Sequence, residues 1–158
     1  MGGSTTIFKR LLAEKNLNMD QKDHYGSTPL SVAARHGHHD LVIFLLEQQE
    51  INLDSRDCFG RTVFSWTNDA AISQALLDTI RKRSIQMNTT IALAKKKVPY
   101  DGVGRWCDVC TLGISKAESY YHCKACNVGN FDVCTDCNAV GASCLGDDHE
   151  LLRELPAS

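Results

Sequence analysis

The sequence lacks a long apolar run and any recognisable set of catalytic groups. No stretch approaches the roughly 18 apolar residues of a membrane span, and Met1–Thr6 contains no apolar core of signal-peptide length. There is no nucleophile paired with a base and no glycine-rich phosphate loop, so we expect no enzyme activity. The formal net charge of −2 excludes little by itself. If seven thiols ionised to hold two zinc ions, the charge would become −2 − 7 + 4 = −5, which argues against nucleic-acid binding through bulk charge. We expect an intracellular protein, cytoplasmic or nuclear, without a membrane span.

What the chain does have is cysteine, concentrated near the C-terminus. Three C-x-x-C knuckles are followed by one more cysteine and a histidine. Tetrahedral zinc takes four thiolate or imidazole ligands, and one C-x-x-C knuckle supplies two of them from a single turn. Eight donors therefore predict two closed, structural zinc sites with no open position for a substrate. The predicted ligands are Cys107, Cys110, Cys123, Cys126, Cys134, Cys137, Cys144 and His149.

The competing interpretation is a disulfide framework. It requires an oxidising compartment and usually a secretory signal, which the sequence does not show. If the sites hold zinc, spacing alone leaves the grouping of ligands open. Either consecutive knuckles share a metal, or the first and third knuckles share one zinc while the second joins Cys144 and His149 in a cross-brace. His122 directly precedes Cys123, so we expect it to be a packed or exposed neighbour rather than a ligand.

The N-terminal half contains an internal repeat. Asp23–Thr28 recurs as Asp57–Thr62, so that Gly26 matches Gly60 at an offset of 60 − 26 = 34 residues. A period of that length is typical of stacked helical units. Cys58 stands alone within the repeat, and we expect it to be a small buried side chain.

The segment Thr28–Leu46 resembles the ankyrin repeat, with its Thr-Pro-Leu opening, paired alanines, Gly-His turn and Leu-Leu second helix. Thr28 can cap a helix that begins at Pro29. Helical spacing predicts that the second helix buries Leu41, Phe44 and Leu45. We expect residues 1–80 to hold a partial repeat, a complete repeat and a degenerate repeat. Because such units bury their faces only against neighbours, we expect the chain to be part of a longer ankyrin protein.

Residues 81–104 are predicted to form a basic linker, with clusters at Arg81–Arg83 and Lys95–Lys97. Their spacing fits a bipartite nuclear localisation signal, but a solvated linker explains them more simply. Met1-Gly2 with Thr6 also fits the short, loose pattern for N-myristoylation.

Residues 105–155 resemble the ZZ-type zinc finger. The motifs are Cys107-Asp-Val-Cys, Tyr121-His-Cys-Lys-Ala-Cys and Phe131-Asp-Val-Cys-Thr-Asp-Cys. Cys144 stands where the family usually has a histidine, in a variant similar to one found beside ankyrin repeats in fungal proteins. The resemblance implies short β-hairpins and a short helix. It implies one zinc on Cys107, Cys110, Cys134 and Cys137 and another on Cys123, Cys126, Cys144 and His149. We expect a miniature core of Trp106, Tyr121, Phe131, Val133 and Leu151.

The combined prediction is a helical ankyrin solenoid fragment followed by a small metal-stabilised finger, acting as a non-catalytic adaptor that docks protein or peptide partners. In ZZ fingers that bind free protein N-termini, acids grip the ammonium group; the matching positions are Asp108 and Asp132, with Asn130 at a third. The competing role for both acids is support of the knuckle backbone. Two further functions fit the sequence less well: the substrate-recognition part of a larger ubiquitin ligase, and nucleic-acid binding through the linker. The chain lacks the ligands of a RING and the helix of a DNA-reading finger.

Overall fold

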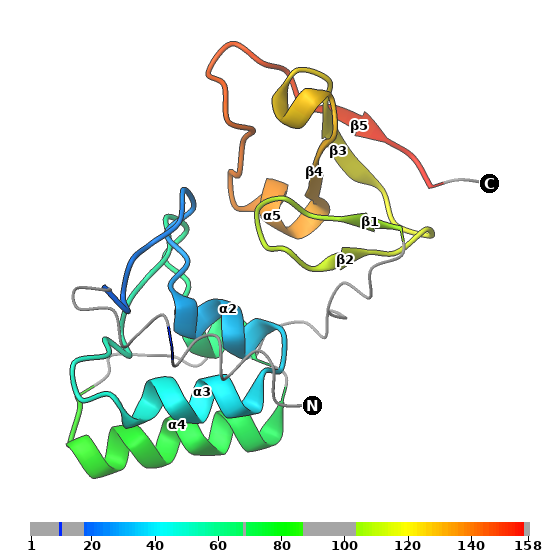
Figure 1. The fold of residues 1–158 in the computed structure, drawn as a ribbon. Coiled ribbons are helices and arrows are strands. Elements are labelled where there is room, and N and C mark those ends of the chain that lie inside the picture. Colours follow the sequence, from blue (N-terminus) through cyan, green and yellow to red (C-terminus); the bar gives the residue numbers. More distant parts are fainter. Residues whose placement is uncertain (1–9, 11–17, 68, 87–103, 157–158) are drawn as a thin grey trace. The chain divides into compact units, whose positions relative to one another are not determined.

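The computed structural model describes residue 10 and residues 18–67, 69–86 and 104–156 (Figure 1). The chain divides into two compact units, Met1–Lys95 and Lys96–Ser158. Within the described residues, no helix combines the length and apolar character needed to cross a membrane. The myristoylation pattern at Met1-Gly2, the second basic cluster at Lys95–Lys97 and most of the partial first repeat lie outside the described residues.

The complete repeat consists of helices α2 (Pro29–Arg35) and α3 (His39–Glu47). Helix α2 begins as the sequence predicts. Thr28 accepts the backbone N–H of Ser31 at 3.3 Å, and the Ser31 hydroxyl accepts the N–H of Thr28 at 2.9 Å, which forms a reciprocal capping box. Gly37, with φ of 70°, then makes the turn into α3.

The buried face of α3 differs from the predicted one. Val42, Leu45 and Leu46 are buried, whereas Leu41 and Phe44 are only half-buried. The reason is that α3 packs between α2 and α4 (Ala70–Arg83), so its buried face must meet two neighbours rather than one (Figure 1). The core of this unit consists of Leu30, Ala33, Ala34, Val42, Leu45, Leu46, Ile51, Leu53, Val63, Phe64, Ile72 and Leu76.

In the second repeat, the first helix is reduced to the 3₁₀ turn η1 (Val63–Ser65). Thr62 makes no side-chain capping bond. Asp69 instead caps the next helix, accepting the N–H groups of Ala71 and Ile72 at 2.9 and 3.0 Å. The repeat offset would start α4 at residue 39 + 34 = 73, but α4 starts at residue 70. The early cap therefore shortens the segment in which a first helix could form.

The loops before the two repeats are built alike. Asp23 and Asp57 each accept two backbone N–H groups, from the residues two and four positions later. The loops touch at Gly26, where a Cβ atom would lie 2.9 Å from the Cα of Asp57, so only glycine fits. The prediction of a buried Cys58 is wrong. Its N–H bonds Tyr25 O at 3.0 Å, but its side chain is exposed because it lies at a loop turn and not on a helix face.

The predicted domain boundary at residue 80 falls inside α4, which continues to Arg83. The Arg83 guanidinium donates to carbonyl oxygens at and beyond the C-terminal end of α3, at 2.6 to 3.4 Å: those of Leu46, Gln48, Gln49 and Ile51. A cation there satisfies helix-end carbonyls and complements the helix dipole. The first basic cluster is therefore part of the folded repeat and not of a linker.

The C-terminal unit is a small sheet-containing domain. Its elements are β1 (Arg105–Trp106), β2 (Gly113–Ile114), β3 (Tyr120–Cys123), η2 (Cys126–Val128), β4 (Phe131–Cys134), α5 (Thr135–Ala139) and β5 (Leu152–Glu154). Strands β1 and β2 form an antiparallel hairpin, and β4, β3 and β5 form a three-stranded sheet in that order (Figure 1). The short hairpins and short helix that the sequence predicts are present.

The core of this unit overlaps the predicted one only in part. Phe131 and Val133 are buried, as predicted, but Trp106, Tyr121 and Leu151 are half-buried. Strand β4 is buried along its whole length, because β3 covers one edge and the Cys107 knuckle covers the other. The additional buried side chains come from the knuckle, from β2 and from the segment after α5: Val109, Leu112, Ile114 and Ala142.

Candidate metal centres and the adjoining pocket

The eight predicted donors gather into two groups of four. One group consists of Cys107, Cys110, Cys134 and Cys137, and the other of Cys123, Cys126, Cys144 and His149. Within each group the donor atoms all lie within 4.8 Å of one another. This alternating arrangement is the one implied by the resemblance to the ZZ finger, so consecutive knuckles do not form one group.

The first group lies where the β1–β2 hairpin meets strand β4. Cys107 and Cys110 occupy the turn between β1 and β2, Cys134 ends β4, and Cys137 lies in α5. The N–H of Cys134 donates to Cys107 Sγ at 3.3 Å, which ties the two segments together at the sulfur. All four cysteines are buried. A metal bound here would be closed off from solvent.

The second group joins β3 to the loop that follows α5. Cys123 ends β3, Cys126 opens η2, and Cys144 and His149 belong to the loop. The ring of His149 packs against Gly146, where a Cβ atom would come within 2.5 Å of the imidazole Nδ1. Glycine at position 146 therefore makes room for the histidine. Cys126 Sγ lies 3.2 Å from His149 Nδ1.

The geometry of the first group fits a tetrahedral zinc ion. Four sulfurs at about 2.3 Å from a tetrahedral centre lie about 3.8 Å apart. The sulfurs of Cys110 and Cys134 are 3.9 Å apart, far beyond the roughly 2.05 Å of a disulfide bond. All eight cysteines, each within the described part of the chain, are present as thiols. The donor set of sulfur and imidazole is the one that zinc prefers.

The ionisation of these thiols also favours a bound cation. The neighbouring Cys107 sulfur raises the pKa of Cys110 and of Cys137, foremost because each of these thiols hydrogen-bonds to it, and also because like charges repel. Cys123 differs: burial acts to raise its pKa, but the N–H groups of Cys126 and Ala125 outweigh it and hold the pKa at about 7. A group of crowded thiols can ionise together only when a metal supplies the compensating charge.

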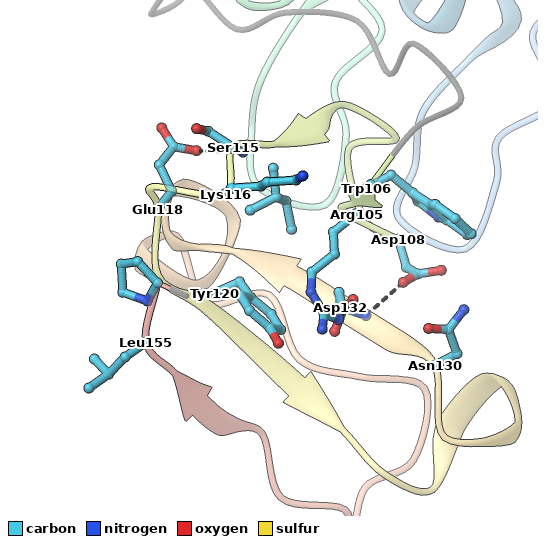
Figure 2. Close-up of a pocket in the computed structure, with 13 residues that line it drawn as sticks. Arg105, Trp106, Asp108, Ser115, Lys116, Glu118, Tyr120, Asn130, Asp132 and Leu155 are labelled. Carbon is cyan, nitrogen blue, oxygen red and sulfur yellow. Dashed lines mark hydrogen bonds and ion pairs between the residues drawn. The ribbon is translucent and has the colours of Figure 1, made fainter. Parts of the chain in front are cut away.

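A cavity of about 510 Å³ lies beside the first group (Figure 2). Asp108 and Asn130 line one end of it, and Lys116, Glu118 and Leu155 line the opposite end. Arg105, Tyr120 and Asp132 lie between the two ends (Figure 2). The pocket therefore brings together both acids that the sequence suggests for binding a free N-terminus.

Asp132 is the centre of a hydrogen-bonded network in this pocket. Its side chain is 6% exposed and accepts from Arg105 Nη1 at 3.0 Å, while His122 Nδ1 lies 2.8 Å from its other oxygen. The N–H of Asp132 donates to Asp108 Oδ2 at 2.7 Å, and the N–H of Asp108 donates to Asp132 O at 2.7 Å. Both acids thus support the backbone beside the first group, which is the competing role considered for them from the sequence.

The two acids nevertheless differ in their access to a ligand. Asp108 is half-buried at the end of the pocket, and burial, foremost, raises the pKa of its carboxyl group. Asp132 lies deeper and carries two cationic or polar side-chain partners. His122 belongs to neither donor group and contacts Asp132, as expected for a packed neighbour of the ligands.

Sequence reasoning missed two residues that shape these sites. Arg105, which pairs with Asp132 across 27 positions, carries no local signal except a basic residue two positions before the first cysteine. Gly146 was visible only as part of the spacing between Cys144 and His149. The role of Arg105 depends on a residue of another strand, and that of Gly146 on how the loop folds back on itself, and spacing reveals neither.

Comparison with known proteins identifies the N-terminal unit. A sequence profile described as ankyrin repeats, in three copies, matches residues 1–89, which is more than half of the chain. The chain belongs to the ankyrin repeat family. Members bury helical faces against neighbouring repeats and present loops and helices to other proteins, so protein partners are implied for this ankyrin repeat protein. The matched profile ends before the C-terminal unit begins.

Curated proteins and solved structures give no further indication of what this ankyrin repeat protein does. No curated protein matches it. Among solved structures it is similar to a chain in the complex of a predatory endopeptidase from Bdellovibrio bacteriovorus with an immunity protein, with 25% identity and a TM-score of 0.46. The similarity covers 60% of this chain and 47% of the other, so the chain spans less than half of that protein. A likeness at this level supports no inference about function.

Proposed function

We propose that this ankyrin repeat protein is a non-catalytic interaction protein whose C-terminal unit is a ZZ-type finger stapled by two structural zinc ions. The observation that carries the proposal is the gathering of eight sulfur and imidazole donors into two groups of four. A zinc ion with four protein ligands has no position left for water or substrate. Function then depends on the surfaces that the two units offer to partners.

The ankyrin unit supplies the first of these surfaces. Its helices stack through one apolar core, while the loops at Asp23 and Asp57 are held rigid by repeated backbone hydrogen bonds. Rigid loops lose little conformational entropy on binding, which favours the docking of a folded protein. Fold membership does not identify the partner, and the sequence names none.

The pocket of the finger supplies the second surface, and we assign it a peptide with a free N-terminus. Its acidic end, at Asp108, lies on the accessible side of the network that Asp132 organises. An ammonium group placed there gains a charge-assisted hydrogen bond to a partly desolvated carboxylate. Asn130 lines the same end and offers an amide oxygen as a further acceptor.

The test is a titration of the zinc-loaded full chain with one labelled peptide in two forms, with a free and with an acetylated N-terminus. We expect acetylation to weaken binding about tenfold or more, since a charge-assisted hydrogen bond contributes about 1.5–3 kcal/mol. Asp108→Asn should cause a similar loss, whereas Asp147→Asn, at an exposed acid outside the pocket, should not. Equal affinity for the two forms of the peptide would refute the assignment.

Two further functions are less favoured. A role as the substrate-recognition part of a larger ubiquitin ligase would use the same docking surfaces and stays a prediction. Nucleic-acid binding through two basic clusters is weakened because Arg83 of the first cluster is engaged by carbonyl groups at and beyond the end of α3. A basic side chain held in that way is not available to contact phosphates.

A further inference from the structure

The charged side chains that line the pocket of the finger differ in how many hydrogen bonds they already make within the protein. Each of its three acids already has a donor from the protein. Asp108 accepts the N–H of Asp132 at 2.7 Å, and Glu118 accepts the N–H of Ser115 at 3.3 Å. Asp132 accepts from Arg105 at 3.0 Å and is only 4% exposed. The pocket therefore presents its acids with part of their hydrogen-bonding capacity used.

Arg105 has hydrogen-bonding capacity to spare. A guanidinium has five N–H donors, and the contact with Asp132 uses one of them. Its side chain is 49% exposed, although Asp132 beneath it is almost fully buried. Lys116, also exposed, lines the same pocket and adds a second positive charge. A ligand that enters this pocket meets cationic donors beyond the acidic end.

The position of Arg105 is fixed from two sides. Its backbone lies in β1, paired with Ile114 of β2, and its guanidinium carbon lies 4.4 Å from the ring centroid of Tyr120 in β3 (Figure 2). Stacking on an aromatic face and pairing with a carboxylate hold the planar group in one orientation. A preorganised guanidinium of this kind suits a second carboxylate better than a mobile lysine does.

Arg105 and Asp108 reach the same residue, Asp132, through its side chain and its backbone N–H respectively. A ligand ammonium at Asp108 would therefore lie near the Arg105 guanidinium, because both groups contact Asp132. The positive charge of Arg105 would repel a basic side chain at the start of the ligand. An acidic side chain there would instead accept hydrogen bonds from the unused N–H groups of Arg105.

We propose that the pocket selects free N-termini with an acidic residue at the first or second position, the ligand carboxylate being bound by Arg105. The proposal rests on the function proposed above. Arg105 also affects ligands that have no carboxylate. The guanidinium partly neutralises Asp132, so the ammonium group of such a ligand competes with the Arg105–Asp132 ion pair and the ligand binds more weakly.

The experiment uses the zinc-loaded full chain and four peptides that differ only at the start: Ala-Glu, Ala-Gln, Ala-Lys and acetyl-Ala-Glu. We expect wild-type protein to prefer Ala-Glu over Ala-Gln by about fivefold to tenfold, with Ala-Lys weakest, the estimate being lowered for partial exposure. In Arg105→Gln the preference for Ala-Glu over Ala-Gln should fall within about twofold, and Arg105→Lys should retain part of it.

Arg153→Gln is the matched control. Arg153 is an exposed arginine on β5 that pairs with Tyr121, and alternation along β3 places Tyr121 on the opposite face from Tyr120. The control should keep the wild-type preference. Zinc content and circular dichroism establish whether each variant is folded. If Arg105→Gln does not fold, the preference for Ala-Glu over Ala-Gln is measured in Arg105→Lys, where it should be reduced but not abolished.

The outcomes separate the two proposals. Dependence on the free amine without a preference for glutamate, or a preference that survives in Arg105→Gln, overturns this inference alone. Equal binding of Ala-Glu and acetyl-Ala-Glu overturns the proposed recognition of free N-termini, and this inference with it. A preference for Ala-Lys over Ala-Glu in the wild type would also contradict the role of Arg105.

Discussion

The two units of the chain solve the problem of stability in different ways. The ankyrin unit packs twelve buried apolar residues into one continuous cluster. Among its described residues, the C-terminal unit has thirteen buried residues counted as apolar, and seven of them are cysteines that belong to the two donor groups. Burial of hydrocarbon therefore dominates the first unit, whereas more than half of these buried residues in the second are thiols that could hold a metal.

Size explains part of this difference. A unit of about 50 residues buries too little apolar surface to offset its loss of conformational entropy without a metal or disulfide. Stacked repeats extend one core from neighbour to neighbour and need no such staple. Removing the metal and removing a core side chain should thus affect opposite halves of the molecule.

The largest expected effect is that of metal removal. A strong zinc chelator should unfold the C-terminal unit, because metal affinity supplies its folding free energy and the crowded thiols lose their compensating charge. Hydrogen exchange resolved by mass spectrometry should show loss of protection across residues 105–155. Protection of α2, α3 and α4 should remain, since their core contains none of the donor groups.

Two results would break the comparison. Retained protection in β3 and β4 after complete metal loss would show that the second unit folds on burial alone. A joint loss of protection in both units would show that they form one cooperative system. Readdition of zinc should restore the original pattern at two ions per chain.

A smaller effect is expected from a cavity in the ankyrin core. Leu45 is fully buried in α3, so Leu45→Ala should lower the free energy of unfolding by about 2–5 kcal/mol. Ile43, in the same helix, is 48% exposed, and Ile43→Ala should change stability by about 0.5 kcal/mol or less. Urea unfolding followed by far-ultraviolet circular dichroism measures both, because most of the helix lies in this unit.

Zinc content provides the complementary measurement for these variants. It should remain at the wild-type value in Leu45→Ala, since the finger shares none of this core. A loss of bound zinc in Leu45→Ala would contradict the view that the ankyrin unit is stabilised by its apolar core and the finger independently by its metal ions.

Local signals made much of the fold predictable. The start of α2 follows from Thr28 and Pro29, whose cap and fixed backbone angle act within one turn. The C-x-x-C spacing likewise restricts the donors to a few residues. The rotation of the buried face on α3 could not be predicted in the same way, because it depends on packing against both α2 and α4. Helical spacing predicts that one face of the helix is apolar, but it does not predict which residues lie at the centre of the buried face.

The candidate site was less predictable than its donors. Spacing left two groupings of the cysteines open, and a resemblance to a family was needed to favour the alternating one. The roles of Asp108 and Asp132 are set by contacts across β1, β3 and β4, above all by Arg105. Such contacts join residues far apart in sequence, so residue type and spacing carry no trace of them.

The smallest effect we predict concerns the single glycine that admits His149 to the second donor group. In Gly146→Ala the new methyl group would lie 2.5 Å from the imidazole Nδ1, so the ring must move away from Cys126. We expect the second zinc to bind about tenfold more weakly, at the lower end of what disturbing the support of a ligand costs. Gly146 and His149 are not members of the first group, and its affinity should stay unchanged.

Competition with a chromophoric chelator can resolve the two affinities. The matched control is Asp147→Ala, at the next position of the same loop, where the side chain is exposed and outside both donor groups. If Gly146→Ala bound both ions as tightly as this control, His149 would not be a ligand, and the second ion would rest on its three cysteines and a water molecule. That outcome would leave the second site with a coordination position open to water or substrate. The proposal of a non-catalytic protein assumes that both zinc ions have four protein ligands, and this result would contradict that assumption.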